Sequence, residues 1–283
     1  MRIVETIPEA KRVVAQAKAE GKTVGFVPTM GAFHAGHLEL MRTARRECGY
    51  VVVSVFVNPT QFAPSDDFER YPRNLKSDAA MAEGEGADLV FAPSAAELYP
   101  EGFDTCVEVG KLGQVLEGAS RPGHFRGVAT VVAKLFTVVS PDKAYFGLKD
   151  NQQLKVIQRM VRDLDFAVEI VPCPTVREPD GLAMSSRNAY LSADERKAAA
   201  VLYGSLRLAE ERVRGGERDA EALQSAVRQM IEAEPLALLD YAAVVDPETL
   251  EPVRQVGDLV LVALAVRIGN TMLIDNTLIE AVR

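Results

Sequence analysis

The segment Tyr50–Val57 reads YVVVSVFV, and its nearly continuous Val and Phe content constrains the fold more than any other stretch. A strand that is apolar on both faces is typical of the centre of a parallel sheet covered by helices on both sides. Helical patterns alternate with similar segments, which predicts a Rossmann-like, doubly wound α/β sheet with ligands beyond the carboxyl ends of its strands. Further strands are expected at Thr23–Val27, Asp88–Phe91, Lys143–Phe146 and Ala167–Val171, and helices at Pro8–Glu20, Leu38–Glu47, Leu75–Glu83, Gly127–Val139 and Asn151–Leu164.

The pattern changes near Pro172–Gly181, where three prolines and a glycine interrupt both periodicities. We therefore expect two domains, residues 1–176 and 177–283. Two helices followed by consecutive strands predict that the second is a small α+β domain. Its helices are expected at Ala193–Val213 and Ala220–Ala233, and its strands at Leu238–Val245, Leu259–Val266 and Met272–Ile279.

Composition limits the class of protein. The chain has 32 Lys and Arg against 40 Asp and Glu, a net charge of −8 that argues against a nucleic-acid partner. Cys48, Cys106 and Cys173 are odd in number and far apart, which indicates neither a disulfide framework nor a zinc knuckle. The first residues do not resemble a signal peptide, and no apolar run is long enough to span a bilayer. We expect a cytoplasmic protein without a membrane segment.

The first candidate site is the glycine-punctuated loop from Thr29 to His37, which holds two of the chain's three histidines, His34 and His37. Backbone N–H groups at a helix N-terminus and closely approaching glycines suit a phosphate. Imidazole N–H donors there would stabilise charge that develops on it. Two other interpretations stay open: surface histidines without a task, and a zinc site, for which the sequence indicates no third ligand.

Two more loops carry groups that suit phosphate. Met184-Ser185-Ser186-Arg187 combines two hydroxyls with a guanidinium, which binds phosphate oxygens as a fork, although such a run is also common in solvated loops. Gly147-Leu148-Lys149-Asp150 follows a predicted strand, where binding loops of open α/β sheets lie. Lys149 would meet a phosphate, while Asp150 would cap the next helix, hold ribose hydroxyls or approach a metal.

Amide side chains form the last candidate. Asn58 and Gln61 stand at the end of the second predicted strand, and Gln152 and Gln153 open a predicted helix. Amides hydrogen-bond the hydroxyl and carboxylate groups of a small polar substrate without adding charge.

His34-Ala35-Gly36-His37, paired with Met184-Ser185-Ser186-Arg187, resembles the two signature loops of the class I aminoacyl-tRNA synthetase and nucleotidylyltransferase superfamily, whose members act on the α-phosphate of a nucleotide. Within it, the chain looks like the pantothenate synthetase family. The likeness covers nearly the whole chain and is carried by residues 28–37, 56–62, 71–73, 116–128 and 180–188.

The resemblance implies a cytoplasmic, homodimeric ligase that uses ATP and Mg²⁺ to condense (R)-pantoate with β-alanine, through a pantoyl adenylate, to pantothenate, AMP and diphosphate. It implies a nucleotide- and pantoate-binding domain over 1–176 and a lid domain over 177–283.

The resemblance also assigns residues, although the metal ligands stay unknown. The catalytic residues would be His37, as proton donor, with His34, Lys149 and Arg187. Gln61 and Gln153 would bind pantoate, and Gln61 and Asn58 β-alanine. Leu148 stands where many members of the family have an acidic residue, so a side-chain role is not expected there. The ATP-binding positions fall on Met30, Gly31, Ala32, Phe33, His34, Ala35, Gly36, His37, Gly147, Leu148, Lys149, Asp150, Val176, Met184, Ser185, Ser186 and Arg187.

Two other functions share these signature loops. A simple adenylyltransferase would move AMP onto a phosphorylated acceptor, and a non-catalytic protein would bind ATP without releasing pyrophosphate. Only the ligase forms free AMP together with an amide. A tRNA synthetase is disfavoured because the charge balance is acidic and no tRNA-binding region is evident.

Overall fold

The computed structural model describes residues 1–63 and 67–281, and the chain divides into two compact units. The main part of the second unit is the chain from Thr175 onward, and two short segments from earlier in the chain, 114–120 and 149–152, also belong to it. Each unit is therefore built from more than one stretch of sequence. The first unit contains Met1–Gly113, Arg121–Leu148 and Gln153–Pro174. The expected domain boundary between residues 176 and 177 remains a prediction.

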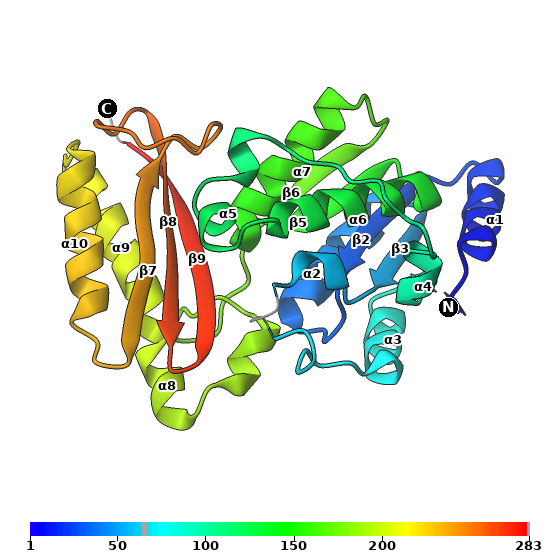
Figure 1. Ribbon diagram of the computed structural model, residues 1–283, viewed down its shortest axis with the longest axis horizontal. Coiled ribbons are helices and arrows are strands. Elements are labelled where there is room, and N and C mark those ends of the chain that lie inside the picture. Colours follow the sequence, from blue (N-terminus) through cyan, green and yellow to red (C-terminus); the bar gives the residue numbers. More distant parts are fainter. Residues whose placement is uncertain (64–66, 282–283) are drawn as a thin grey trace. The chain divides into compact units, whose positions relative to one another are not determined.

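The first unit is built on a parallel sheet of six strands in the order β1-β4-β3-β2-β5-β6. Figure 1 labels β2, β3, β5 and β6 of this sheet. The strand order reverses between β2 and β5, which pair through Gly25 and Phe26. This is the switch point at which ligands bind in open α/β sheets, and the doubly wound prediction is confirmed. The strands are β1 (Arg2–Val4), β2 (Val24–Thr29), β3 (Tyr50–Val55), β4 (Leu89–Phe91), β5 (Lys143–Gly147) and β6 (Glu169–Cys173).

Helices cover both faces of this sheet because consecutive strand residues are buried on opposite sides. On β2, the Phe26 ring meets Phe136 of α6 at 6.3 Å between centroids, whereas Val27 packs in a cluster with Met41 of α2 and Tyr145 of β5. Because neighbouring residues of a strand face two different helical layers, nearly every residue of the strand has to be apolar. The longer helices whose main part lies in this unit are α1 (Ile7–Ala19), α2 (Ala35–Glu47), α3 (Leu75–Gly84), α6 (His124–Val139) and α7 (Asn151–Asp163). The short helices are α4 (Ala95–Leu98), η1 (Pro59–Gln61) and η2 (Lys111–Gly113). The short helix η3 (Leu148–Asp150) has Leu148 in the first unit and its other two residues in the second.

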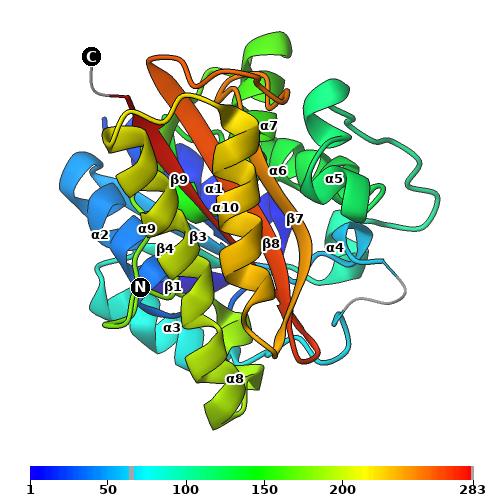
Figure 2. The same cartoon turned by 90° about the vertical axis from the view of Figure 1, so that its left-hand side faces the viewer.

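The second unit pairs helices with an antiparallel sheet of order β7-β8-β9, which confirms the predicted α+β class. Helices α9 and α10 lie side by side along one face of this sheet (Figures 1 and 2). Leu202 and Leu223 of these helices and Leu264 of β8 are completely buried in one shared core. The elements are α5 (Glu117–Ser120), η4 (Ser186–Tyr190), α8 (Ala193–Ala198), α9 (Ala200–Arg214), α10 (Ala220–Glu232), β7 (Ala237–Val245), β8 (Leu259–Ile268) and β9 (Thr271–Glu280).

One predicted helix of the second unit is divided. The expected helix Ala193–Val213 is α8 followed by α9, with Ala199 between them. The Leu202 N–H donates to the Ala199 carbonyl at 3.2 Å, an i to i+3 bond that tightens the turn locally. No helix within residues 1–63 and 67–281 has the length and apolar content needed to cross a membrane.

Candidate active site

The loop after β2 leaves the sheet through a tight turn at Thr29 and Gly31. The Thr29 hydroxyl donates to the Ser54 carbonyl at 2.6 Å and accepts the Gly31 N–H at 3.1 Å. Gly31 has φ +82, and a Cβ there would lie 2.8 Å from Oδ2 of Asp78. Both the left-handed backbone and the crowding therefore require glycine at this position.

Asp78 of α3 holds the next part of the loop. The residue is only 2% exposed, and its carboxylate accepts the N–H groups of Ala32 at 3.0 Å and Phe33 at 2.9 Å. Ala32 has φ +53, a conformation unfavourable for a residue with a side chain. Bonds from backbone N–H groups to a charged acceptor are strong, so Asp78 stabilises the strained turn. We did not predict this role. Its signal in the sequence is an acidic residue on the buried face of a helix.

His34 and His37 complete the loop as the cap of α2. The His34 Nδ1 accepts the Gly36 N–H at 3.1 Å, and the His37 Nδ1 accepts the His34 N–H at 3.4 Å. The helix therefore begins at Ala35, three residues before the expected start at Leu38. A neutral imidazole that accepts through Nδ1 carries its proton on Nε2. Each ring thus has an Nε2–H donor near a helix N-terminus, with the ring centroids 4.1 Å apart.

The Gln61 amide is held by Asn58 in one orientation. The Asn58 Nδ2 donates to Gln61 Oε1 at 3.0 Å, and the Asn58 Oδ1 accepts the Tyr99 hydroxyl at 2.8 Å. The Gln61 Nε2 contacts Met30 Sδ at 3.2 Å, so two predicted site residues meet here. Asn58 is only 1% exposed and holds Gln61 in place. Its expected contact with β-alanine remains a prediction.

The start of α6 holds the backbone of Gln61. The His124 Nδ1–H donates to the Gln61 carbonyl at 2.8 Å, and Arg121 donates to the same oxygen at 3.3 Å. A Cβ at Gly127 would lie 2.4 Å from the Thr60 carbonyl oxygen, so only glycine lets α6 pack this closely against η1. The sequence indicates no role for His124, and its contact with Gln61 was not predicted. The signal is Gly127, an isolated glycine inside a helical pattern.

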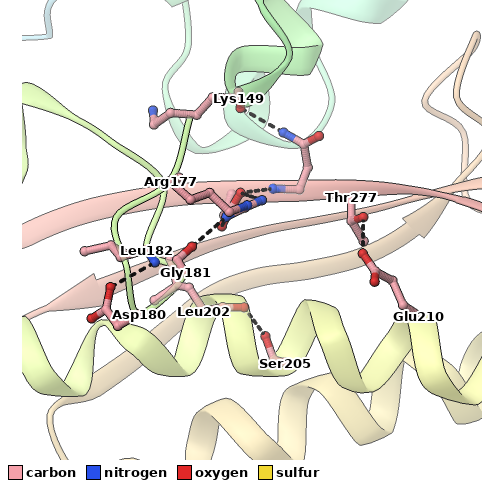
Figure 3. A network of polar contacts seen from close by, with 12 residues as sticks. Lys149, Arg177, Asp180, Gly181, Leu182, Leu202, Ser205, Glu210 and Thr277 are labelled. Carbon is pink, nitrogen blue, oxygen red and sulfur yellow. Dashed lines mark hydrogen bonds and ion pairs between the residues drawn. The ribbon is translucent and has the colours of Figure 1, made fainter. Parts of the chain in front are cut away.

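In the second unit, Lys149 and Asp150 stand beside each other before α7. Their Nζ and Oδ1 atoms are 3.6 Å apart, with the Lys149 side chain 18% exposed and that of Asp150 44% exposed. The Lys149 carbonyl accepts a hydrogen bond from the Asn276 amide at 2.8 Å (Figure 3). Lys149 is therefore fixed through its main chain. Gln153, the expected pantoate ligand, is half-buried on α7.

The second signature loop follows a hairpin that Val176 and Met184 close. The Met184 N–H donates to the Val176 carbonyl at 2.9 Å. At the hairpin turn, a Cβ on Gly181 would lie 1.8 Å from the Tyr203 ring, which again requires glycine. Ser185 then caps η4, and its hydroxyl oxygen accepts the Arg187 N–H at 3.3 Å. A hydroxyl that accepts in this way keeps its O–H as a donor.

Arg196 stabilises the same hairpin through two acidic side chains. It donates to Glu178 at 2.6 Å and to Asp180 at 2.5 Å, and these bonds hold the pKa of both carboxyl groups below their usual range. Glu178 in turn accepts the Asn188 amide at 2.9 Å. The residues after Ser186 are thereby fastened to the hairpin.

The predicted site residues are distributed over both units. The first unit contains Met30 to His37, Asn58, Gln61, Gly147, Leu148 and Gln153, and the second contains Lys149, Asp150, Val176 and Met184 to Arg187. In the part of the chain that the structure describes, no group of three His, Cys, Asp or Glu side chains is placed to hold a metal ion. No such group of the described residues surrounds His34 and His37, where a zinc site was one of the open interpretations.

Comparison with known proteins gives a consistent result. The family model for pantoate–β-alanine ligase matches residues 2–278. Pantothenate synthetases of Roseiflexus castenholzii and Thermotoga petrophila are 56% and 53% identical to this chain, covering 99% of it and 100% of each relative. The crystal structure of pantothenate synthetase from Thermus thermophilus has a TM-score of 0.94 at 50% identity, covering 98% of this chain and 99% of that one. The pantoate–β-alanine ligase of Francisella tularensis, solved with β-γ ATP and β-alanine, has a TM-score of 0.81 at 34% identity, covering 98% and 97%.

Proposed function

The chain belongs to the pantoate–β-alanine ligase family, and from this premise we propose how its residues divide the reaction among them. The reaction is the ATP-dependent condensation of (R)-pantoate with β-alanine to pantothenate, AMP and diphosphate through a pantoyl adenylate. The observation that carries the assignment is the pair of histidines whose Nδ1 atoms accept backbone N–H groups at the start of α2, which places the proton of each neutral ring on Nε2.

In the first step, the pantoate carboxylate attacks the α-phosphate of ATP. A carboxylate is already ionised at neutral pH and needs no general base, so the protein has to position it in line with the leaving group. We assign this task to Gln61 and Gln153. The bonds to the side chain and main chain of Gln61 support its part, because they leave its amide in one orientation.

Charge grows on the phosphates as pyrophosphate leaves. Donors aimed at the places where charge develops lower the barrier more than they strengthen binding. We assign His34 and His37 of the first unit to this task, with His37 as proton donor, and Lys149, Ser185, Ser186 and Arg187 of the second. The remaining ATP contacts are proposed for Met30 to Phe33, Ala35, Gly36, Gly147, Leu148, Asp150, Val176 and Met184.

In the second step, the neutral amine of β-alanine attacks the acyl carbon of the adenylate and displaces AMP. We propose that Gln61 and Asn58 orient the amine. We also propose that the second unit acts as a lid, because an acyl adenylate hydrolyses readily and its protection from water favours amide formation.

We further propose that Mg²⁺ accompanies ATP and that the protein is a cytoplasmic homodimer, as the sequence resemblance implies. Mg²⁺ usually keeps several waters and binds substrate phosphates with one or two carboxylates. The half-exposed Asp150 carboxylate, beside Lys149, fits such a donor set. When bound, the ion would neutralise phosphate charge.

Isotope exchange tests the two-step reaction. Pantoate alone should support exchange of labelled pyrophosphate into ATP, since the first step is reversible and complete without the amine. Adding β-alanine should then yield AMP and pantothenate in equal amounts. Exchange that strictly required β-alanine would contradict a free adenylate, and ATP binding without any exchange or product would favour a non-catalytic protein.

A further inference from the structure

Two neighbouring residues of β9, Asp275 and Asn276, each hold a different part of the proposed ATP site of the second unit. Asn276 donates its side-chain amide to the Lys149 carbonyl at 2.8 Å. Asp275 forms a two-pronged ion pair with Arg177, at 2.6 Å to Nη1 and 3.0 Å to Nη2. Lys149 and Arg177 are far apart along the chain from β9, so the strand is their common support.

We propose that Asp275 and Asn276 are positioning residues for ATP. They hold Lys149 and the second signature loop on one strand, so that the two phosphate-binding segments of this unit keep a fixed separation. This inference rests on the proposed function, in which Lys149 and residues 184–187 contact ATP.

The Asp275 side chain is completely buried, and this strengthens its hold on the hairpin. A forked guanidinium–carboxylate pair fixes direction as well as distance. The Arg177 guanidinium also donates to the Gly181 carbonyl at 3.0 Å and lies 4.6 Å from the centre of the Tyr203 ring. Arg177 pairs with Ala183 across the hairpin, next to Met184. The anchor therefore lies directly before the signature loop.

The two anchors are also linked to each other. The Asp275 Oδ1 accepts the Asn276 main-chain N–H at 2.8 Å, in addition to its bond with Arg177. Lys149 has a long side chain, so the position of its ammonium group depends on how firmly its main chain is held. The Asn276 amide therefore acts on the lysine through the backbone, without touching the phosphate.

Replacing Asn276 tests the proposal. Asn276→Leu keeps nearly the same volume but has no donor for the Lys149 carbonyl. Loss of the hydrogen bond to the Lys149 carbonyl corresponds to about a tenfold effect, and we expect kcat/KM for ATP in pantoate-dependent pyrophosphate exchange to fall by about that factor or more. The KM for pantoate should change less than about twofold. Asn276→Gln, which restores an amide donor, should recover part of the loss.

Thr277→Val provides the matched control. Thr277 is the next residue on β9, and its hydroxyl donates to Glu210 of α9 at 2.8 Å (Figure 3). The valine variant also loses one hydrogen bond of the same strand, but on the side of α9. It should keep normal kinetics with ATP at a similar melting temperature. If Asn276→Leu does not fold, Asn276→Ala takes its place in the comparison.

The outcomes separate this inference from the proposed function. If Lys149→Met is impaired while folded Asn276→Leu matches Thr277→Val with ATP, the positioning role of Asn276 is wrong. If Lys149→Met itself has normal activity, the proposed role of Lys149 is wrong instead. If Asn276→Leu lowers the melting temperature but does not selectively lower kcat/KM for ATP, Asn276 has a purely structural role and the proposal is wrong.

Discussion

At the scale of single residues, the two ring nitrogens of each signature histidine have different tasks. Nδ1 accepts a backbone N–H and caps the start of α2, and this bond also fixes the direction of the ring. In the neutral ring, Nε2 then carries the proton, and it is the donor that the proposed mechanism requires. A substituted side chain that accepts the backbone N–H but has no group in the place of Nε2–H would therefore keep the start of the helix and lose the proposed donor.

His37→Ala should reduce turnover much more than binding. By analogy with removal of one transition-state donor in other enzymes, kcat should fall by roughly 10²–10³-fold, with a much smaller change in the KM for pantoate. Steady-state kinetics and a circular-dichroism melt check both parts. A folded variant with nearly normal kcat would exclude the imidazole as donor and shift that role to Lys149 and the helix-terminal amides.

His124 is the matched histidine for this experiment. Its Nδ1–H reaches the Gln61 carbonyl, so its effect passes through the placement of Gln61. His124→Ala should lower kcat less than His37→Ala does, and its main effect should appear in the KM for pantoate. Equal losses of kcat in the two variants would contradict this division of roles.

At the scale of elements, the alternation of apolar strands and amphipathic helices was enough to predict both sheets. Phe26 and Val27 illustrate the reason, since neighbouring residues had to be apolar to face two different layers. The edge strand β1 was missed because its three residues are too few to show a period. The start of α2 was placed too late because a histidine cap has no strong signal in the sequence.

Arg196 gives the hairpin before the second signature loop a dependence on pH. It lowers the pKa of Glu178 and Asp180, so its stabilising effect is complete above the usual carboxylate pKa values of about 4 and is lost as the pH falls through the lowered values. Arg196→Met should therefore melt at a lower temperature than the wild type at pH 7. The difference should shrink on acidification below about pH 4, and melts across this range would show it. A difference that stayed constant would mean that the ion pairs contribute nothing to the stability.

At the scale of the whole molecule, the signature loops were recognisable from the sequence but their supports were not. Asp78 lies 46 positions after Ala32, and Asn276 lies 127 positions after Lys149. Contacts at such separations leave no period in a single sequence. What was predictable is the chemistry of the loops, and what required the structure is the set of side chains that hold them.

A fragment of residues 1–176 should fold but have no ligase activity. It contains all six strands of the parallel sheet, whereas Ser185, Ser186 and Arg187 lie beyond its end. Lys149 would remain, but without the Asn276 bond to its carbonyl. Circular dichroism should show cooperative melting, and pyrophosphate exchange should be undetectable. Substantial exchange by the fragment would remove the second loop from the mechanism.

The position of β9 in the chain has a consequence for synthesis on the ribosome. Both segments that Asp275 and Asn276 hold are translated well before β9, so neither has its anchor while the chain is still growing. A nascent chain can complete its parallel sheet, but the proposed phosphate-binding segments of the second unit obtain their anchors only after residue 276 has left the exit tunnel. Unfinished chains would then not consume ATP or release a reactive adenylate.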